Sequence, residues 1–431
     1  MARNLLNSFL FTRRLAIRPS AAALAVLGSA VAVGTLALGS VGCGGSRGGL
    51  TVVSSVVGRT TWTAIDTSRT ETFGPTAGGP RKLGLEVWYP ASPRATGTPG
   101  PLLPAAVAET LEAATGIPAS LLMALPTQSL LEAVMPDGRQ KFPVVVFSHG
   151  NTTFPLESTS TAEALAARGF VVVGISHTGN AQFTRLDDTV VPADPLAQIE
   201  GVTPLPVPGS PFSVYAEYRA NVAKQSQIFS RDIRFVLDEL ERRNTSDPRL
   251  KQRLDLSRVG VFGYSYGASH AFDAGRADAR IRAVAGVDGT LWSADYDKGI
   301  RKPYLVFVGT RPTAEEFAVL RAEYIAMGYT PAQADQAVAW SQTEPASHAA
   351  SPGSILVRMP KAQHSNFTDF GIWKGLGFPA DEVSPEVPAA SLLATYRKYL
   401  VAFFEEHLAG RRQPILREPS RDPNAVVSIQ D

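Results

Sequence analysis

Residues 259–267 read Val-Gly-Val-Phe-Gly-Tyr-Ser-Tyr-Gly, and this stretch decides the fold. Its first four residues predict a short buried strand, and residues 266–274 predict a helix directly after it. Between them lies the pattern Gly-x-Ser-x-Gly, centred on Ser265. A serine between a strand and a helix in this pattern is typical of a nucleophile elbow, a strained turn that needs glycine on both sides. The alternative is a glycine-rich turn whose serine has no chemical role.

Working outward from this turn, short apolar runs alternate with amphipathic segments. Runs such as FPVVVF are apolar throughout, which suits parallel strands covered on both faces. The alternation predicts an α/β fold, a mostly parallel central sheet covered by helices on both faces, with helical insertions. The predicted strands are 51–57, 83–89, 142–147, 170–175, 259–262, 281–287, 304–308 and 355–359. The predicted helices are 159–168, 228–243, 266–274, 314–340 with a break near 328–329, and 391–408, with a helical insertion at 105–135 and a surface excursion at 181–215.

Composition bounds the class of protein. The 431 residues are 44% hydrophobic, and 41 Lys and Arg against 39 Asp and Glu give a net charge of +2. The hydrophobic content excludes a disordered chain, and the near-neutral charge offers no basic footprint for nucleic acid. The single cysteine excludes an internal disulfide framework and a cysteine-based zinc site. We expect one catalytic domain over residues 51–409 and a C-terminal tail over 410–431.

Residues 1–42 predict an export signal. They contain four arginines and no acidic residue, and the run 21–41 is uncharged and rich in small and apolar residues. Cys43 follows where bacterial lipoprotein signals place the cysteine that becomes lipidated, and residues 43–50 then form a Gly/Ser tether. We therefore expect a protein of the cell envelope, held at the membrane surface through lipidated Cys43, or a secreted protein. The alternatives are a permanent membrane helix and a cysteine that merely ends a cleaved peptide.

A serine nucleophile needs a general base within hydrogen-bond distance. In hydrolases with this elbow the chain order is serine, acid, histidine. Four of the six histidines follow the serine, at positions 270, 348, 364 and 407. His270 lies on the elbow helix, too close in sequence to Ser265 to face back onto it. His348 lies in a polar stretch. His407 is typical of a solvated helix end. His364 follows the last predicted strand by a short loop, so we predict that it is the base. The alternative is a loop histidine that stabilises Asp369.

The acid is expected one strand after the serine. Asp288 ends the predicted strand 281–287, where a carboxylate reaches the imidazole and fixes its tautomer. The loop after the next strand, 309–313, contains no aspartate. The less favoured candidates are Asp295, Asp297, Glu315 and Glu316.

The oxyanion of an acyl-transfer intermediate needs two N–H donors. One comes from the loop after the predicted strand 142–147, and the other from the residue after the nucleophile. These positions are Asn151 and Tyr266. His149 is interpreted as structural, and His177 either lines the pocket or packs in a loop. We predict no metal and no cofactor.

Five segments carry a resemblance to a known family. They are LEVWYP at 85–90, FSHG at 147–150, GYSYG at 263–267, Asp288, and HSNFTDF at 364–370. Together they resemble the platelet-activating factor acetylhydrolase family, plasma type and bacterial relatives, over roughly residues 83–408. The resemblance implies an α/β-hydrolase fold and calcium-independent serine esterase activity. It also implies a triad of Ser265, Asp288 and His364 with oxyanion donors at Asn151 and Tyr266. The chain differs in having Tyr264 where the family commonly has histidine, Ala268 where it commonly has glycine, and a long helical insert near 314–342.

These observations predict a serine ester hydrolase that works through an acyl-enzyme. Its expected substrates are short-acyl esters on small molecules or lipids, including phospholipids that resemble platelet-activating factor. Other possibilities are a cutinase-like polyester hydrolase or general carboxylesterase, an acyltransferase, and a non-catalytic envelope-binding lipoprotein that keeps the fold.

Overall fold

The computed structural model describes residues 56–430 except 188, 208, 294 and 342–351. The predictions for the export signal, Cys43 and the tether lie outside the described residues, as does His348. None of the described helices combines the length and the apolar composition that a bilayer crossing requires.

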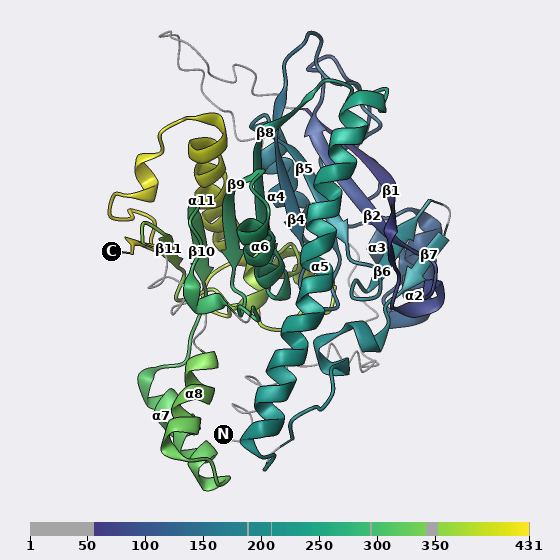
Figure 1. Ribbon diagram of the computed structural model, residues 1–431. Helices are drawn as coiled ribbons and strands as arrows, with labels where there is room; N and C mark the ends of the chain where they lie inside the picture. The colour runs from purple at the N-terminus through teal and green to yellow at the C-terminus, as the bar shows by residue number, and fades with distance from the viewer. Residues whose placement is uncertain (1–55, 188, 208, 294, 342–351, 431) are drawn as a thin grey trace.

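A ten-stranded sheet forms the centre of the molecule, in the order β12-β11-β10-β9-β8-β4-β5-β2-β1-β3 (Figure 1). The strands from β11 to β5 are parallel to one another, and β12, β2 and β1 run antiparallel to their inner neighbours. The strands are β1 (Val57–Thr70), β2 (Pro80–Pro90), β3 (Leu130–Leu131), β4 (Phe142–Ser148), β5 (Val171–Ser176), β8 (Leu254–Tyr264), β9 (Ile281–Val287), β10 (Tyr304–Val308), β11 (Ile355–Arg358) and β12 (Val426–Ile429). A separate hairpin consists of β6 (Phe183–Leu186) and β7 (Thr189–Pro192).

Helices bury both faces of this sheet, as the continuously apolar strands require. Along β4, Val145 and Phe147 join one apolar cluster, and Val144 and Val146 join the other. The first cluster includes residues of α4 (Thr159–Ala167) and α11 (Ala389–Ala409). The second includes residues of α5 (Phe212–Ser246) and α6 (Tyr266–Ala277), which cross the front of the sheet in Figure 1. The predicted two-faced α/β fold is therefore confirmed.

The predicted break in the helical segment 314–340 is present. Helices α7 (Ala314–Ala326) and α8 (Pro331–Ser341) form a hairpin that projects beside the start of α5 in Figure 1. Tyr215 of α5 packs with Tyr324 of α7 and Ala337 of α8 in a small apolar cluster of its own. The hairpin is thus an appendage fixed to α5 and not part of the sheet.

Several segments differ from the predictions. The strand predicted at 51–57 lies mostly outside the described residues, and β1 runs from Val57 to Thr70, although no strand was predicted at 58–70. Helix α5 begins at Phe212, sixteen residues before the predicted start at 228, and the excursion 181–215 contains the hairpin β6–β7. The insertion 105–135 comprises α2 (Ala105–Thr115), α3 (Ala119–Met123) and β3. The segment 410–431, predicted without regular structure, adds β12 to the edge of β11. Of these, the pairing of β12 with β11 joins parts of the chain that are distant in sequence.

Candidate active site

The predicted elbow is present at the end of β8. Ser265 lies between β8 and α6 with φ 54° and ψ −120°, a backbone conformation that non-glycine residues rarely adopt. A Cβ on Gly263 would lie 1.9 Å from the carbonyl oxygen of Gly267, and one on Gly267 would lie 2.1 Å from that of Ser148. Only glycine fits these two positions, because α6 returns directly over the strand ends. The close approach of α6 to β4 brings the serine beside the loop that follows β4.

The structure brings Ser265, His364 and Asp288 into one hydrogen-bonded row. His364 Nε2 lies 2.9 Å from Ser265 Oγ, and His364 Nδ1 lies 2.7 Å from Asp288 Oδ2. Ser265 follows β8, Asp288 follows β9 and His364 follows β11. The carboxyl ends of these strands meet at one edge of the sheet. Because Asp288 accepts the proton on Nδ1, Nε2 is left as the acceptor that a serine hydroxyl requires. The arrangement has the geometry of a Ser-His-Asp triad.

Two groups hold the Asp288 carboxylate in place through Oδ1, the oxygen that does not contact His364. The Gly309 N–H donates to Oδ1 at 2.8 Å, and the Arg311 guanidinium lies 3.3 Å from the same oxygen. Burial alone would raise the pKa of Asp288, but Arg311, His364 and Gly309 outweigh it and lower that pKa to about 2. Asp288 is therefore ionised at neutral pH, with one oxygen fixed by the protein and the other free to orient His364.

The surroundings of His364 raise its pKa. Burial opposes the charged form, yet the hydrogen bond and charge of Asp288, together with the charge of Glu382, raise the pKa above 6.5. The ring of Tyr264 stacks on the imidazole at 4.8 Å between centroids, and the Tyr264 hydroxyl donates to the His364 carbonyl at 3.1 Å. Sequence reasoning assigned no part to Tyr264 or Arg311. The place of Tyr264 next to the nucleophile was the only signal for it.

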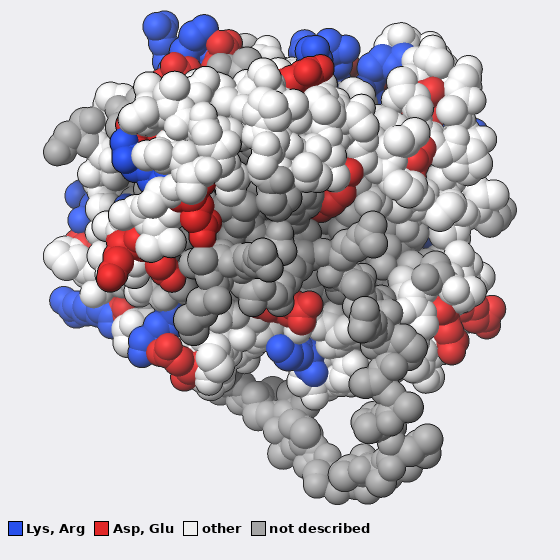
Figure 2. All heavy atoms as spheres, turned by 90° about the horizontal axis from the view of Figure 1, so that it is seen from below, with Lys and Arg blue, Asp and Glu red and all other residues white. Residues whose placement is uncertain are grey.

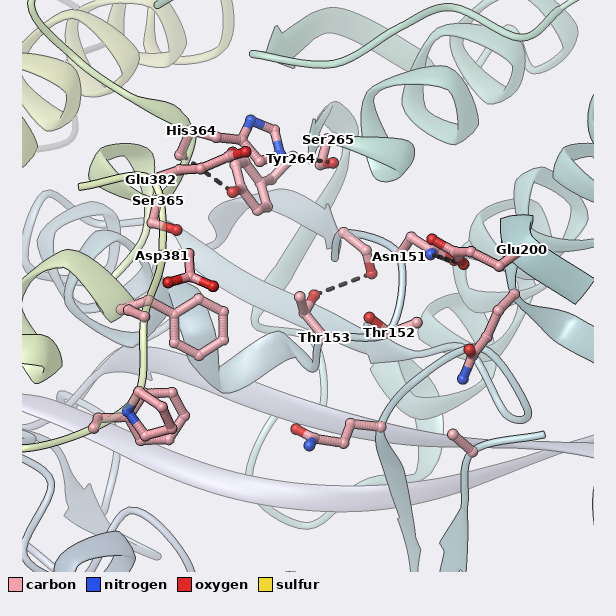
Figure 3. Close-up of a pocket in the computed structure, with 18 of the residues that line it drawn as sticks. Asn151, Thr152, Thr153, Glu200, Tyr264, Ser265, His364, Ser365, Asp381 and Glu382 are labelled. Carbon is pink, nitrogen blue, oxygen red and sulfur yellow. Dashed lines mark hydrogen bonds between the residues drawn. The ribbon is translucent and has the colours of Figure 1, made fainter. Parts of the chain in front are cut away.

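Asn151 and Tyr266 occupy the positions expected of oxyanion donors. Tyr266 is the first residue of α6, where backbone N–H groups have no acceptor within the helix. Asn151 follows Gly150 in the loop after β4 and lines the same cavity as Ser265 (Figure 3). The Asn151 side chain is held by donation to Glu200 at 2.9 Å and by acceptance from Asn180 at 2.9 Å. This loop is thus fixed beside the serine.

The remaining described histidines lie away from the row. His177 is fully buried between Asp232 and Ser148, at 2.9 Å from each, so it packs in the interior and does not line the cavity. His149 is also buried and donates through Nδ1 to the Gly150 carbonyl at 2.6 Å, in agreement with a structural role. His270 bonds to Ser148 Oγ at 3.0 Å, on the side of α6 away from Ser265. His407 lies beside Glu406 near the end of α11.

The other acids considered do not approach His364. Asp295 pairs with Lys298 at 2.7 Å, and Asp297 is exposed in the same short 3-10 helix. Glu316 caps the start of α7 through Thr313, and Glu315 is exposed beside it. Asp369 accepts from the Ser160 N–H at 2.8 Å, so it is fixed by α4 and not by His364. Of the acids weighed from the sequence, Asp288 is the one that contacts the imidazole.

A cavity of about 460 Å³ opens beside Ser265 and His364 (Figure 3). Phe370 and Phe378 line its apolar part, and Ile117 from the insertion 105–135 reaches it. Its charged lining consists of three carboxylates and includes no lysine or arginine among the described residues: Glu200, Asp381 and Glu382. A charged substrate group placed there therefore meets carboxylates and no lysine or arginine from the described lining.

No metal site is evident in the described part of the chain. No group of three or more His, Cys, Asp or Glu residues there is arranged to hold a metal ion. The face seen from below in Figure 2 mixes acidic and basic side chains and shows no continuous basic patch among the residues described.

Comparisons with known proteins agree with the fold. The family model for platelet-activating factor acetylhydrolase, isoform II, matches residues 86–191. A probable 1-alkyl-2-acetylglycerophosphocholine esterase of Arthroderma benhamiae is 21% identical over 299 residues, which are 67% of this chain and 66% of that protein, just under two thirds of its length. The solved structure of a ferulic acid esterase from Streptomyces cinnamoneus matches with a TM-score of 0.65 and 24% identity, over 89% of this chain and 98% of that one. These matches confirm the α/β-hydrolase fold and the resemblance to the acetylhydrolase family.

Proposed function

We propose that this relative of the platelet-activating factor acetylhydrolases is a carboxylic ester hydrolase with Ser265 as its nucleophile. The observation that carries the proposal is the row Ser265–His364–Asp288, with hydrogen bonds of 2.9 and 2.7 Å, in the wall of a cavity. The names of the family model and of the curated relative support the same reaction.

The geometry supports a two-step acyl-enzyme mechanism. Ser265 Oγ attacks the ester carbonyl while His364 Nε2 takes its proton, and His364 then gives that proton to the departing alcohol. Asp288 holds the imidazole in the tautomer that accepts at Nε2 and stabilises the imidazolium. The N–H groups of Asn151 and Tyr266 bind the oxyanion, and a water activated by His364 releases the acid.

The finer proposal concerns the substrate. We propose short-acyl esters, among them phospholipids that resemble platelet-activating factor, as the resemblance and the name of the curated relative suggest. The carboxylates Glu200, Asp381 and Glu382 disfavour a substrate with a net negative charge, because it would meet like charge, whereas a zwitterionic phospholipid has no net charge. Neutral acyl groups, and alcohols that are neutral or carry a cation, suit this lining.

A panel of esters tests the function. Purified mature protein should hydrolyse p-nitrophenyl acetate or butyrate and release the short acyl group from a short-chain phospholipid, whereas Ser265→Ala should do neither. Preference for polyester film or long acyl chains would favour a cutinase-like or general carboxylesterase. Transfer to added alcohols in preference to water would favour an acyltransferase. Absence of turnover with folded protein would leave the binding lipoprotein as the better account.

We also propose that the chain is exported and anchored in the cell envelope through Cys43. The basis is the sequence of residues 1–43, with its basic start, uncharged run and terminal cysteine. Mass spectrometry of the mature N-terminus should find a lipidated Cys43. A soluble product that begins elsewhere in a Cys43→Ala variant and in the wild type alike would contradict the anchor.

A further inference from the structure

The loop that carries Asn151 is backbone-strained and held by several contacts. Thr152 has φ 61°, which a β-branched residue rarely adopts. The Thr153 hydroxyl donates to the Gly150 carbonyl at 3.0 Å, and the Gly150 N–H donates to Glu157 Oε1 at 3.1 Å. A loop in such a conformation keeps its shape only while these contacts persist. The position of the Asn151 N–H therefore depends on them.

Glu157 connects this loop to the segment that carries His364. Its side chain accepts from Gly150, and its backbone carbonyl accepts from the Asp369 N–H at 2.7 Å. Asp369 lies five residues after His364 and bonds through its carboxyl to Ser160 of α4. Glu157 thus contacts both the loop 150–153, here called the oxyanion loop, and the segment 364–369 that carries His364, and it does not itself line the cavity.

The surroundings of Glu157 favour an uncharged carboxyl group. Its side chain is completely buried, and Oε2 has no hydrogen-bond partner among the described residues. The groups that act on its charge are the Asp369 carboxyl, Thr153 and the Gly150 N–H, with an electrostatic influence between it and Tyr264 and Tyr396, and no lysine or arginine is among them. Burial raises the pKa of Glu157 to about 8, and Asp369 adds to the rise. A charged carboxylate there would have the Gly150 N–H and Thr153 as its donors and no lysine or arginine beside it.

We propose that Glu157 is a positioning residue of the ester hydrolase, whose uncharged carboxyl group holds the oxyanion loop in its working shape. Ionisation in alkaline solution then places a charge at this buried site beside the Asp369 carboxyl. The Gly150 N–H bond by itself favours the charged form, so the cost comes from the buried charge, and we expect the surroundings to rearrange and kcat to fall. The inference rests on the proposed function, because it assigns Glu157 to the same reaction through Gly150 and Asn151. A positioning role for Glu157 differs from simple packing, since packing alone would not make turnover depend on the charge of the Glu157 carboxyl group.

Two substitutions separate charge from shape. Glu157→Gln keeps the oxygen that accepts from Gly150 and cannot ionise, whereas Glu157→Leu removes that acceptor. We expect kcat of the wild type on p-nitrophenyl butyrate, corrected for spontaneous hydrolysis, to fall at least threefold between pH 7.5 and 9.5 with a midpoint at about pH 8. Glu157→Gln should keep kcat within about threefold of the wild type at pH 7 and lose this alkaline decline, and Glu157→Leu should lose at least tenfold in kcat with little change in KM.

The matched control is Asp273→Asn. Asp273 is another buried acid, it lies on α6, it accepts from Gln227 at 2.8 Å, and it does not line the cavity. This variant should leave the alkaline decline in place. An alkaline decline that persists in Glu157→Gln, or full kcat in Glu157→Leu, would overturn the proposal. Failure of the proposed function itself would be recognised separately, as wild-type protein without serine-dependent turnover.

Thermal melts give a second readout that does not depend on turnover. The folded pKa of Glu157 lies above its ordinary value of 4.5, so the stability linked to this group is present below pH 4.5 and is lost as pH rises toward 8. Relative to the wild type, Glu157→Gln should therefore melt at a progressively higher temperature between pH 5 and pH 8. A Tm difference that stays constant over this range would also contradict an uncharged Glu157.

Discussion

Replacing Asp288 by asparagine tests how His364 is prepared for proton transfer. The Gly309 N–H and the Arg311 guanidinium both approach Oδ1, so the amide oxygen of asparagine must occupy that position. The amide NH₂ then replaces Oδ2, which lies 2.7 Å from His364 Nδ1. A donor at that place requires Nδ1 to be an acceptor and moves the ring proton to Nε2. The imidazole then donates to Ser265 and cannot take its proton.

The loss follows from this wrong tautomer. Asparagine in place of the triad aspartate lowers kcat by about 10⁴-fold in serine proteases, which corresponds to about 5.4 kcal/mol in the barrier. We expect a decrease of that order in kcat on p-nitrophenyl butyrate at pH 7, with KM and Tm nearly unchanged. Asp295→Asn and Glu315→Gln serve as controls and should retain wild-type kcat. A decrease of less than about 100-fold in Asp288→Asn, or an equal decrease in Glu315→Gln, would refute the reasoning.

Three further outcomes follow from the same site. The pKa of His364 is raised, and only its neutral form is a base, so kcat/KM should fall on acidification with a midpoint above pH 6.5; a midpoint well below 6.5 would contradict the contact with Asp288. Arg311→Gln removes a charge 3.3 Å from Asp288 and should lower kcat/KM at pH 7 by about fivefold, whereas unchanged kinetics would show that Gly309 suffices to hold the carboxylate. Gly267→Ala places a Cβ 2.1 Å from the Ser148 carbonyl oxygen, so it should lower the free energy of unfolding in urea by about 1–3 kcal/mol or more and abolish activity. The control is Gly375→Ala, where the added Cβ meets no atom within 4 Å.

The sequence was informative where local pattern and fold topology coincide. The apolar runs at 142–147 and 283–287 are too continuous for exposed strands, and both lie in buried parts of the parallel sheet. The carboxyl ends of such strands meet at one edge, which is why Ser265, Asp288 and His364 were found although 99 residues separate the serine from the histidine. The elbow glycines marked the turn because their replacement would force Cβ atoms into backbone.

The parts that were missed depend on contacts between distant segments. Nothing near Glu157 in the sequence indicates that its side chain binds Gly150 and its carbonyl binds Asp369, 212 residues later. The partnership of Arg311 with Asp288 likewise appears only when β9 and β10 are side by side. The early start of α5 did carry a signal, since Tyr215, Tyr218 and Val222 recur at helical spacing and are all buried.

The central claim is that Ser265 is the activated nucleophile, and covalent labelling tests it most directly. Purified protein is treated with a fluorophosphonate and the modified residue is located by mass spectrometry of its peptides. We predict one adduct per chain, on Ser265, and none in a folded Ser265→Ala variant. Folded wild-type protein without an adduct, or with the adduct on another serine such as the fully buried Ser148 beside His177, would contradict the account.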